Sequence, residues 1–155
     1  MRRIALTLLL VSSTSLAQER PSLSTLQGIS AVVASSAHPD IEEGALVRHA
    51  EERLRKAGLL AEPNTTAAGR LLVDVYVVRS RYGRCQYLAY DVALRLEESA
   101  TLERSPGERI QAVTWRGTGR TSRFTSALPA ESVMEIVDNK LNALIGDAAK
   151  DRTPR

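Results

Sequence analysis

Alternation of apolar and polar side chains is the clearest pattern in this chain. Residues 70–80 and 86–98 each place apolar side chains at every second position. A strand with one apolar and one polar face belongs to a sheet that is covered on one side only. Residues 81–84, which contain Gly83, predict the turn of an antiparallel hairpin. The apolar positions are Leu71, Val73, Val75 and Val77 in the first strand, and Leu88, Tyr90, Val92, Leu94 and Leu96 in the second.

Two other segments repeat their apolar residues at helical spacing, which predicts helices over residues 41–57 and 130–149. Asp40 stands three positions before Glu43, an arrangement that resembles a capping box. Gly58 is well placed to end the first helix. The stripes consist of Leu46, Ala50, Leu54 and Ala57 in the first helix, and Val133, Val137, Leu141, Leu144 and Ala148 in the second.

Two further strands complete the predicted order βαβββα. Residues 26–34 form the first strand, residues 105–107 a turn, and residues 108–121 the fourth strand. Gly117 and Gly119 predict a bend or bulge near the end of that strand. Its apolar residues are Ile110, Val113 and Trp115.

The predicted fold class is α/β (α+β), a two-layer sandwich. A four-stranded mixed sheet in the order 1-2-3-4 carries both helices on its aliphatic face, and the first crossover is right-handed with parallel strands. Residues 26–149 form the single domain, residues 18–25 a flexible segment and residues 150–155 a disordered tail.

The first seventeen residues have the order of a secretory signal peptide. Two arginines precede an apolar run over residues 4–11, and small residues at 15–17 suit cleavage before Gln18. The run is shorter than the roughly 20 apolar residues that span a bilayer. We expect residues 1–17 to be removed and the protein to be periplasmic or secreted.

The charge balance and the single cysteine limit the partners. The chain has 21 Lys and Arg against 18 Asp and Glu, and residues 1–17 hold two of the arginines and no acid. The remainder is nearly neutral, and this charge balance does not favour nucleic acid as a partner.

Cys85 is the only cysteine, so its thiol is either free or bridged to another molecule. We expect no lipid anchor and no transmembrane segment.

The predicted strand order gathers arginines at one end of the domain, where two strands end and the central hairpin turns. Guanidinium groups bind phosphate or carboxylate in a bidentate manner. The sequence therefore suggests an anion site, with a merely solvated hairpin as the alternative. Its members are Arg79, Arg81, Arg84, Arg116, Arg120 and Arg123.

The polar face of the hairpin also carries apolar and aromatic residues, and such a patch on an uncovered sheet can be a protein interface. Scattered exposed tyrosines without a partner are the alternative. The candidate interface residues are Leu72, Tyr76, Val78 and Tyr87.

Residues with catalytic or metal-binding chemistry are few. His38 and His49 are the only histidines, and nothing around them has the pattern of a zinc site or of a nucleophile with its base. Asp74 and Asp91 are expected on the open face of neighbouring strands as two solvated carboxylates, with a paired acid/base role as the alternative. We predict no cofactor, no metal and no catalytic residue.

Residues 113–117, Val-Thr-Trp-Arg-Gly, resemble a turn of small uncharacterised bacterial envelope proteins, in which it follows a strand pair and precedes a last amphipathic helix. The βαβββα order is similar to that of the lipopolysaccharide-assembly lipoprotein of the outer membrane. The pattern covers residues 28–150. Many of the proteins that the chain resembles are lipoproteins, and the chain departs from them because no cysteine follows the expected cleavage site. The resemblance implies an envelope accessory or binding role and transfers no catalytic residue.

Three functions remain open. The first is a non-enzymatic envelope accessory protein that binds another envelope protein, or itself, through the tyrosine-bearing face. The second is a binder of anionic lipid or acidic glycan through the arginine-rich end. A small secreted hydrolase is the least favoured, because no nucleophile–base pair is apparent.

Overall fold

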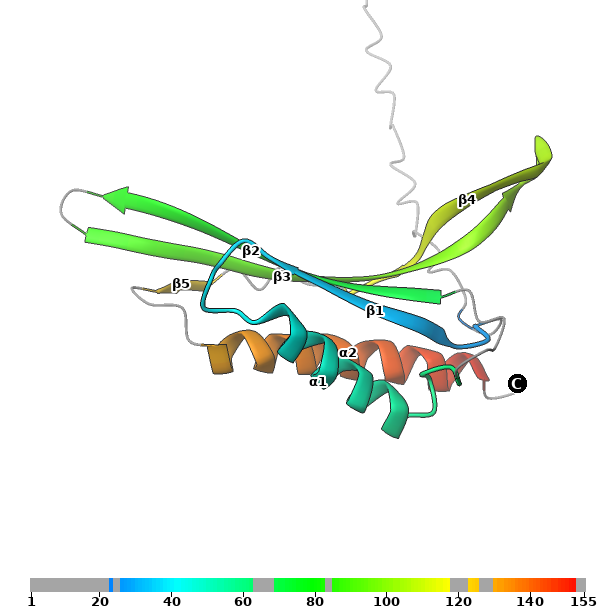
Figure 1. Ribbon diagram of the computed structural model, residues 1–155, viewed down its shortest axis with the longest axis horizontal. Coiled ribbons are helices and arrows are strands. Elements are labelled where there is room, and N and C mark those ends of the chain that lie inside the picture. The colour runs from blue at the N-terminus through cyan, green and yellow to red at the C-terminus, as the bar shows by residue number, and fades with distance from the viewer. Residues whose placement is uncertain are drawn as a thin grey trace, which may run out of the picture.

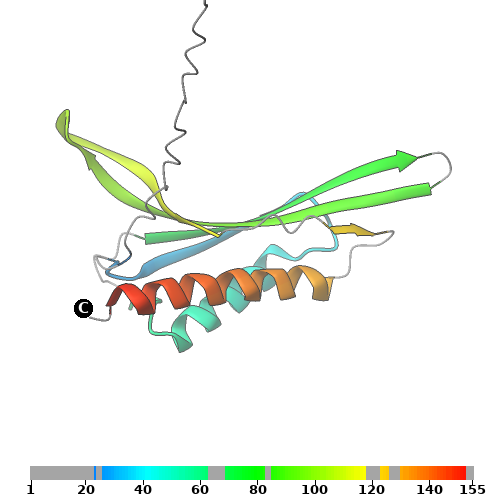
Figure 2. The same cartoon turned by 180° about the vertical axis from the view of Figure 1, so that it is seen from behind.

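The fold has two layers, a mixed sheet and a pair of helices that lie on one face of it (Figure 1 and Figure 2). The computed structural model describes Leu23 and residues 26–62, 69–82, 85–117, 123–125 and 130–152. The two-layer α+β arrangement expected from the sequence is confirmed. The expected signal peptide lies outside the described residues.

The order of elements follows the prediction with one addition. The elements are β1 (Ile29–Ser36), α1 (Glu43–Lys56), β2 (Gly69–Tyr82), β3 (Cys85–Leu102), β4 (Ser105–Arg116), β5 (Arg123–Thr125) and α2 (Ala130–Arg152). The four long strands lie in the predicted order β1-β2-β3-β4, with β1 parallel to β2 and the other pairs antiparallel. The additional strand β5 pairs with β3.

The strands β4 and β5 share one edge of β3. The last residue of β4 is opposite Arg95, and the first residue of β5 is opposite Tyr90. Six residues, 117–122, join the two strands, whereas only four, 91–94, separate their partners on β3. The strand predicted over residues 108–121 therefore ends earlier, at Arg116, and β5 lies beyond its predicted end.

The turn before β4 differs from the prediction. It lies at Glu103 and Arg104, and Leu102 pairs with Ser105, so Pro106 belongs to β4. Proline usually marks a turn because it has no backbone N–H to donate. An edge strand such as β4 tolerates it, because one side of the strand has no neighbour.

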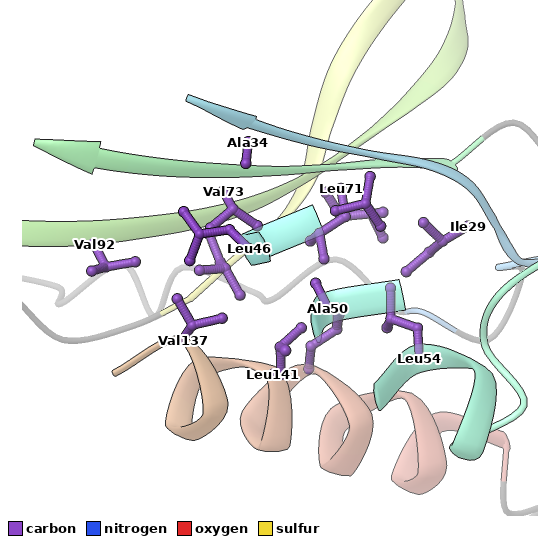
Figure 3. Packing of buried hydrophobic residues seen from close by; sticks show 14 of the residues in the cluster. Ile29, Ala34, Leu46, Ala50, Leu54, Leu71, Val73, Val92, Val137 and Leu141 are labelled. Carbon is purple, nitrogen blue, oxygen red and sulfur yellow. The ribbon is translucent and has the colours of Figure 1, made fainter. Parts of the chain in front are cut away.

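The core lies between the sheet and the helices, and Figure 3 shows side chains of α1 between the sheet and α2. The predicted alternation of β2 and β3 is confirmed, and each buried aliphatic side chain contributes about 1.5–3 kcal/mol relative to exposure. The buried residues of the two strands are Leu71, Val73, Val75, Tyr90, Val92, Leu94 and Leu96. The helices contribute Leu46, Ala50, Leu54, Val133, Ile136, Val137, Leu141, Leu144 and Ala148.

The start of α1 is not the predicted capping box. Its N-cap is Glu42, which makes no side-chain cap bond. The Glu43 carboxylate instead accepts a hydrogen bond from the backbone N–H of Ser36, at 2.8 Å. The predicted stop is confirmed, because Gly58 has φ of 66° and follows the C-cap Ala57.

The last helix is longer than predicted. α2 continues to Arg152, so residues 150–152 are helical rather than a disordered tail. The Asp151 carboxylate accepts a hydrogen bond from the backbone N–H of Leu23, which is itself buried. This contact fixes both the last turn of α2 and one residue of the segment 18–25.

Two hairpin arms extend beyond the helices at opposite ends of the molecule (Figure 1). β1 ends opposite Val75, so β2 and β3 continue past it as the β2–β3 arm. At the other end, β3 continues beyond Glu98 and forms the β3–β4 arm with β4, its only neighbour there among the described residues. None of the helices in the described part of the chain is both long and apolar enough to cross a membrane.

Candidate functional site

The sheet face turned away from the helices, called here the open face, carries large exposed apolar side chains. Tyr76 is 52% exposed, Val78 62% and Tyr87 40%. Val78 is opposite Ala89 on β3, and Tyr87 lies two positions before Ala89 on the same strand. Such diagonal neighbours are within reach of an aromatic side chain. The three residues therefore form one patch on the β2–β3 arm, which we call the tyrosine patch.

Leu72, the fourth predicted interface residue, does not join this patch. It is half-buried, and it lies between Arg95 on β3 and Val33 on β1, which is 44% exposed. Asp74 occupies the same face between Leu72 and Tyr76. The structure thus brings three of the four predicted residues together and separates the fourth by a carboxylate.

A polar network surrounds that carboxylate and links β1, β2 and β3. The Ser35 hydroxyl donates to Asp74 Oδ1 at 2.9 Å, and Arg95 Nη2 lies 3.1 Å from Asp74 Oδ2. Arg95 Nε lies 3.7 Å from Glu97 Oε1, and Arg70 Nη2 donates to Glu97 Oε2 at 2.8 Å. The expectation that Asp74 is solvated is wrong, because these neighbours leave it only 8% exposed.

The contact between Asp74 and Arg95 is an ion pair rather than a well-formed hydrogen bond. Asp74 Oδ2 and Arg95 Nε are both buried without a hydrogen-bond partner of adequate geometry. Because desolvation of buried charges opposes their attraction, such a pair contributes little net stability but is costly to break. Its position between three strands indicates a structural role.

The predicted arginine cluster does not form as expected. Arg79 and Arg81 are exposed on the β2–β3 arm, opposite Leu88 and Gln86 on β3. Arg116 is opposite Arg95, which lies seven positions from Leu88, or roughly 23 Å along the strand at about 3.3 Å per residue. β4 ends near the middle of β3, so its last arginine never reaches the hairpin.

The remaining members of that cluster are only partly defined. Arg123 begins β5, where its backbone pairs with Tyr90 near the β2–β3 arm. Arg84, Arg120 and the side chain of Arg123 lie outside the described part of the structure. By the alternation of β2, Arg79 lies on the helix side of the sheet, on the face opposite to the tyrosine patch.

The two histidines have local structural contacts. His38 is 7% exposed, and its Nδ1 accepts a hydrogen bond from the backbone N–H of Asp40 at 3.3 Å. His49 Nε2 lies 2.8 Å from Asp138 Oδ1 and joins α1 to α2. Among the described residues, no group of three or more His, Cys, Asp or Glu could hold a metal ion. The side chain of Cys85 lies outside that part.

The β3–β4 arm exposes two of the three apolar residues of the predicted fourth strand. Val113 is 43% exposed and Ile110 is 37% exposed, whereas Trp115 is buried. The β3–β4 arm bends away from the two helices (Figure 2), so neither helix covers these side chains. The spacing of apolar residues in β4 carries no signal of this bend.

Comparison with known proteins gives no relative. No protein family, no curated protein and no solved structure matches the chain. The exposed surfaces described above are therefore the grounds on which a function is proposed.

Proposed function

We propose that the protein is an exported, non-enzymatic accessory protein that binds another protein of the cell envelope through the tyrosine patch. The observation that carries the proposal is the exposure of Tyr76, Val78 and Tyr87, between 40% and 62%, on two adjacent strands. Tyrosine is enriched at protein interfaces because it combines a large apolar ring with a hydroxyl that forms hydrogen bonds. The signal-peptide pattern of residues 1–17 supports the compartment.

The setting of the patch favours contact with a macromolecule. It lies on the β2–β3 arm, beyond the end of β1, so the open face there is accessible from above and from the side (Figure 1). Its edge is polar, since Asp91 is opposite Tyr76. An apolar centre with a polar rim is the usual organisation of a protein interface.

A double substitution, Tyr76→Ser with Val78→Ser, tests the proposal. The matched control is Ile110→Ser, which removes an exposed apolar side chain from the other arm. Each protein is immobilised and exposed to envelope proteins at low and at high salt. Proteins retained by the wild type and by the control at both salt concentrations should be lost from the double variant. Equal retention by the double variant would exclude the tyrosine patch as the binding surface.

A second candidate function, binding of anionic lipid or acidic glycan, is favoured by Arg79 and Arg81. Both are exposed, and neither has a carboxylate partner within the described residues. They lie on the other face of the same arm from the tyrosine patch. Binding through these arginines weakens as salt rises, whereas apolar contact through the tyrosine patch does not.

A further inference from the structure

The outer edge of β1 has a short stretch whose backbone pairs with no other strand of the described residues. Hydrogen bonds to other parts of the chain occupy the backbone groups at both ends of this stretch. At the start, Ile29 N–H donates to the Leu59 carbonyl at 2.8 Å, and Ala61 N–H donates to the Ile29 carbonyl at 2.9 Å. At the end, Ser36 N–H donates to the Glu43 carboxylate. Within the described residues, no strand pairs with the outer side of residues 31–35, which we call the β1 edge.

The β1 edge lacks the features with which proteins protect exposed strands. Its sequence is Ala-Val-Val-Ala-Ser, without charge or proline. The opposite edge of the sheet, β4, contains Pro106, Glu108 and Arg109 and has two register shifts against β3. Proline, charge and irregular register all discourage a further strand from pairing. Proline and charge are present on β4 and absent from the β1 edge, and the one register shift of β1, between Ile29 and Ala31, lies at the start of that edge. The contrast indicates that β1 is the side on which the sheet can be extended.

We propose that a second copy of this chain pairs with the β1 edge, antiparallel and about a two-fold axis that passes through Val33. In that register Val33 lies opposite the partner's Val33, and Ala31 lies opposite the partner's Ser35. Because every pair then joins residues of the same sheet face, both helix layers stay on one side. The two sheets become one continuous sheet, and the open faces of both copies join.

The β1 edge fits a second copy because it is self-complementary. Ile29 lies two positions before the edge and Ser36 one position after it, and the register centred on Val33 pairs the same five residues, 31–35, in both copies. An interface that places one surface against itself is typical of a two-fold dimer. Val33, 44% exposed in the single chain, becomes covered by its own counterpart on the axis.

The helix beneath the edge does not oppose this pairing. On α1, His49 and Arg53 face α2 through Asp138, so Glu51 and Arg55 lie toward the opposite flank. That flank therefore carries both signs of charge rather than a single one.

Charge substitutions at Val33 test the proposal directly. Val33→Lys and Val33→Glu each place two like charges next to each other on the axis. Each should raise the dissociation constant of the dimer by about tenfold or more. An equimolar mixture of the two variants should dimerise again, because unlike charges then meet. Sedimentation velocity over a range of concentrations measures each case, and far-UV circular dichroism shows that each variant is folded. The control, Val78→Lys, changes an exposed valine of the tyrosine patch and should leave the dimer intact.

A cross-link provides a second measurement. Directly opposite Cα atoms of an antiparallel pair are about 4.5–5.5 Å apart, a separation that a disulfide can bridge. Val33→Cys in a Cys85→Ser background should therefore form a covalent dimer when an added oxidant such as copper phenanthroline removes the two thiol protons and two electrons. Val78→Cys in the same background should not. A wild-type protein that stays monomeric at all concentrations, or equal cross-linking at both positions, would overturn the proposal.

The test separates this inference from the proposed function. The β1-edge dimer is independent of the tyrosine patch, so Tyr76→Ser with Val78→Ser should remain dimeric while losing its envelope partner. Val33→Lys should be monomeric and still bind that partner through the patch. Loss of dimerisation in the Tyr76 and Val78 double variant would show that self-association uses the patch and not the edge.

Discussion

The indole N–H of Trp115 donates a hydrogen bond to the carboxylate of Asp147, at 3.1 Å, and thereby joins β4 to α2. Trp115 is 7% exposed. Trp115→Phe removes the donor and part of the ring, and it should lower the free energy of unfolding by about 1–3 kcal/mol. Asp147→Asn keeps an acceptor oxygen and should cost less. Urea denaturation of the three proteins measures the difference, and a Trp115→Phe variant as stable as the wild type would contradict the importance of this bond.

A large-to-small change on the two faces of the sheet should have unequal effects. Leu94 is fully buried between β3 and the helices, whereas Val78 is 62% exposed on the open face. Leu94→Ala should lower the free energy of unfolding by about 2–5 kcal/mol, and Val78→Ala should change it by less than about 0.5 kcal/mol. Urea denaturation decides between this outcome and equal losses, which would mean that both faces of the sheet are covered.

Two glycines should respond to alanine in opposite directions. Gly58 has φ of 66°, and an added Cβ would meet no atom within 4 Å. Gly58→Ala should destabilise the protein by about 1 kcal/mol through backbone strain alone. Gly146 lies inside α2 with equal space around it. Gly146→Ala should stabilise the protein by about 0.5–1 kcal/mol because alanine favours the helix. Thermal unfolding of both variants gives the two signs, and a shift of the same sign in both would refute the backbone explanation.

The exposed pair of Glu52 and Lys56 on α1 predicts a pH effect. The hydrogen bond from Lys56 Nζ, at 2.6 Å, and then the lysine charge hold the pKa of Glu52 below its usual value. Since the pKa is lower in the folded chain, the stabilisation is present above the unfolded chain's pKa. It is lost as the pH falls through the folded pKa. Lys56→Gln should raise the pKa of Glu52 in an NMR titration of side-chain carboxyl carbons. Lys150→Gln, on α2, should leave that pKa unchanged.

The arginines of the β2–β3 arm should be dispensable for folding. Arg79→Ser with Arg81→Ser removes two exposed side chains, so the melting temperature should change little. The same variant should lose salt-sensitive binding to vesicles that contain anionic lipid. Arg55→Ser, an exposed arginine of α1, is the control. Undiminished vesicle binding at low salt by the Arg79 and Arg81 variant would exclude an anion site on this arm.

The sequence predicts those parts of the fold that depend on a residue pattern within a single segment of the chain. The alternation of apolar and polar residues in β2 and β3 predicts which face of each strand is buried, and Gly58 predicts where α1 ends. The boundaries of β4 are harder, because Pro106 has the chemistry of a turn and is tolerated only by virtue of its place at a sheet edge. That place depends on the pairing of distant strands.

The candidate sites depend still more on register. Alternation places Tyr76 and Val78 on the open face, so the tyrosine patch is predictable in part. The position of Arg116 opposite Arg95 depends on the length of β3 relative to β4, and the burial of Asp74 depends on the register of β1. Neither relation has a signature within a single segment.

The parallel pairing of β1 with β2 has a consequence for the order of folding. Ile29 is paired with Gly69, about forty residues later, whereas Tyr82 is paired with Cys85 across a short turn. Closing a long loop costs more chain entropy than closing a short one. We therefore expect the β2–β3 hairpin to be part of the folding nucleus and β1 to dock late. Substitutions at the hairpin should then slow refolding, while substitutions in β1 should mainly accelerate unfolding.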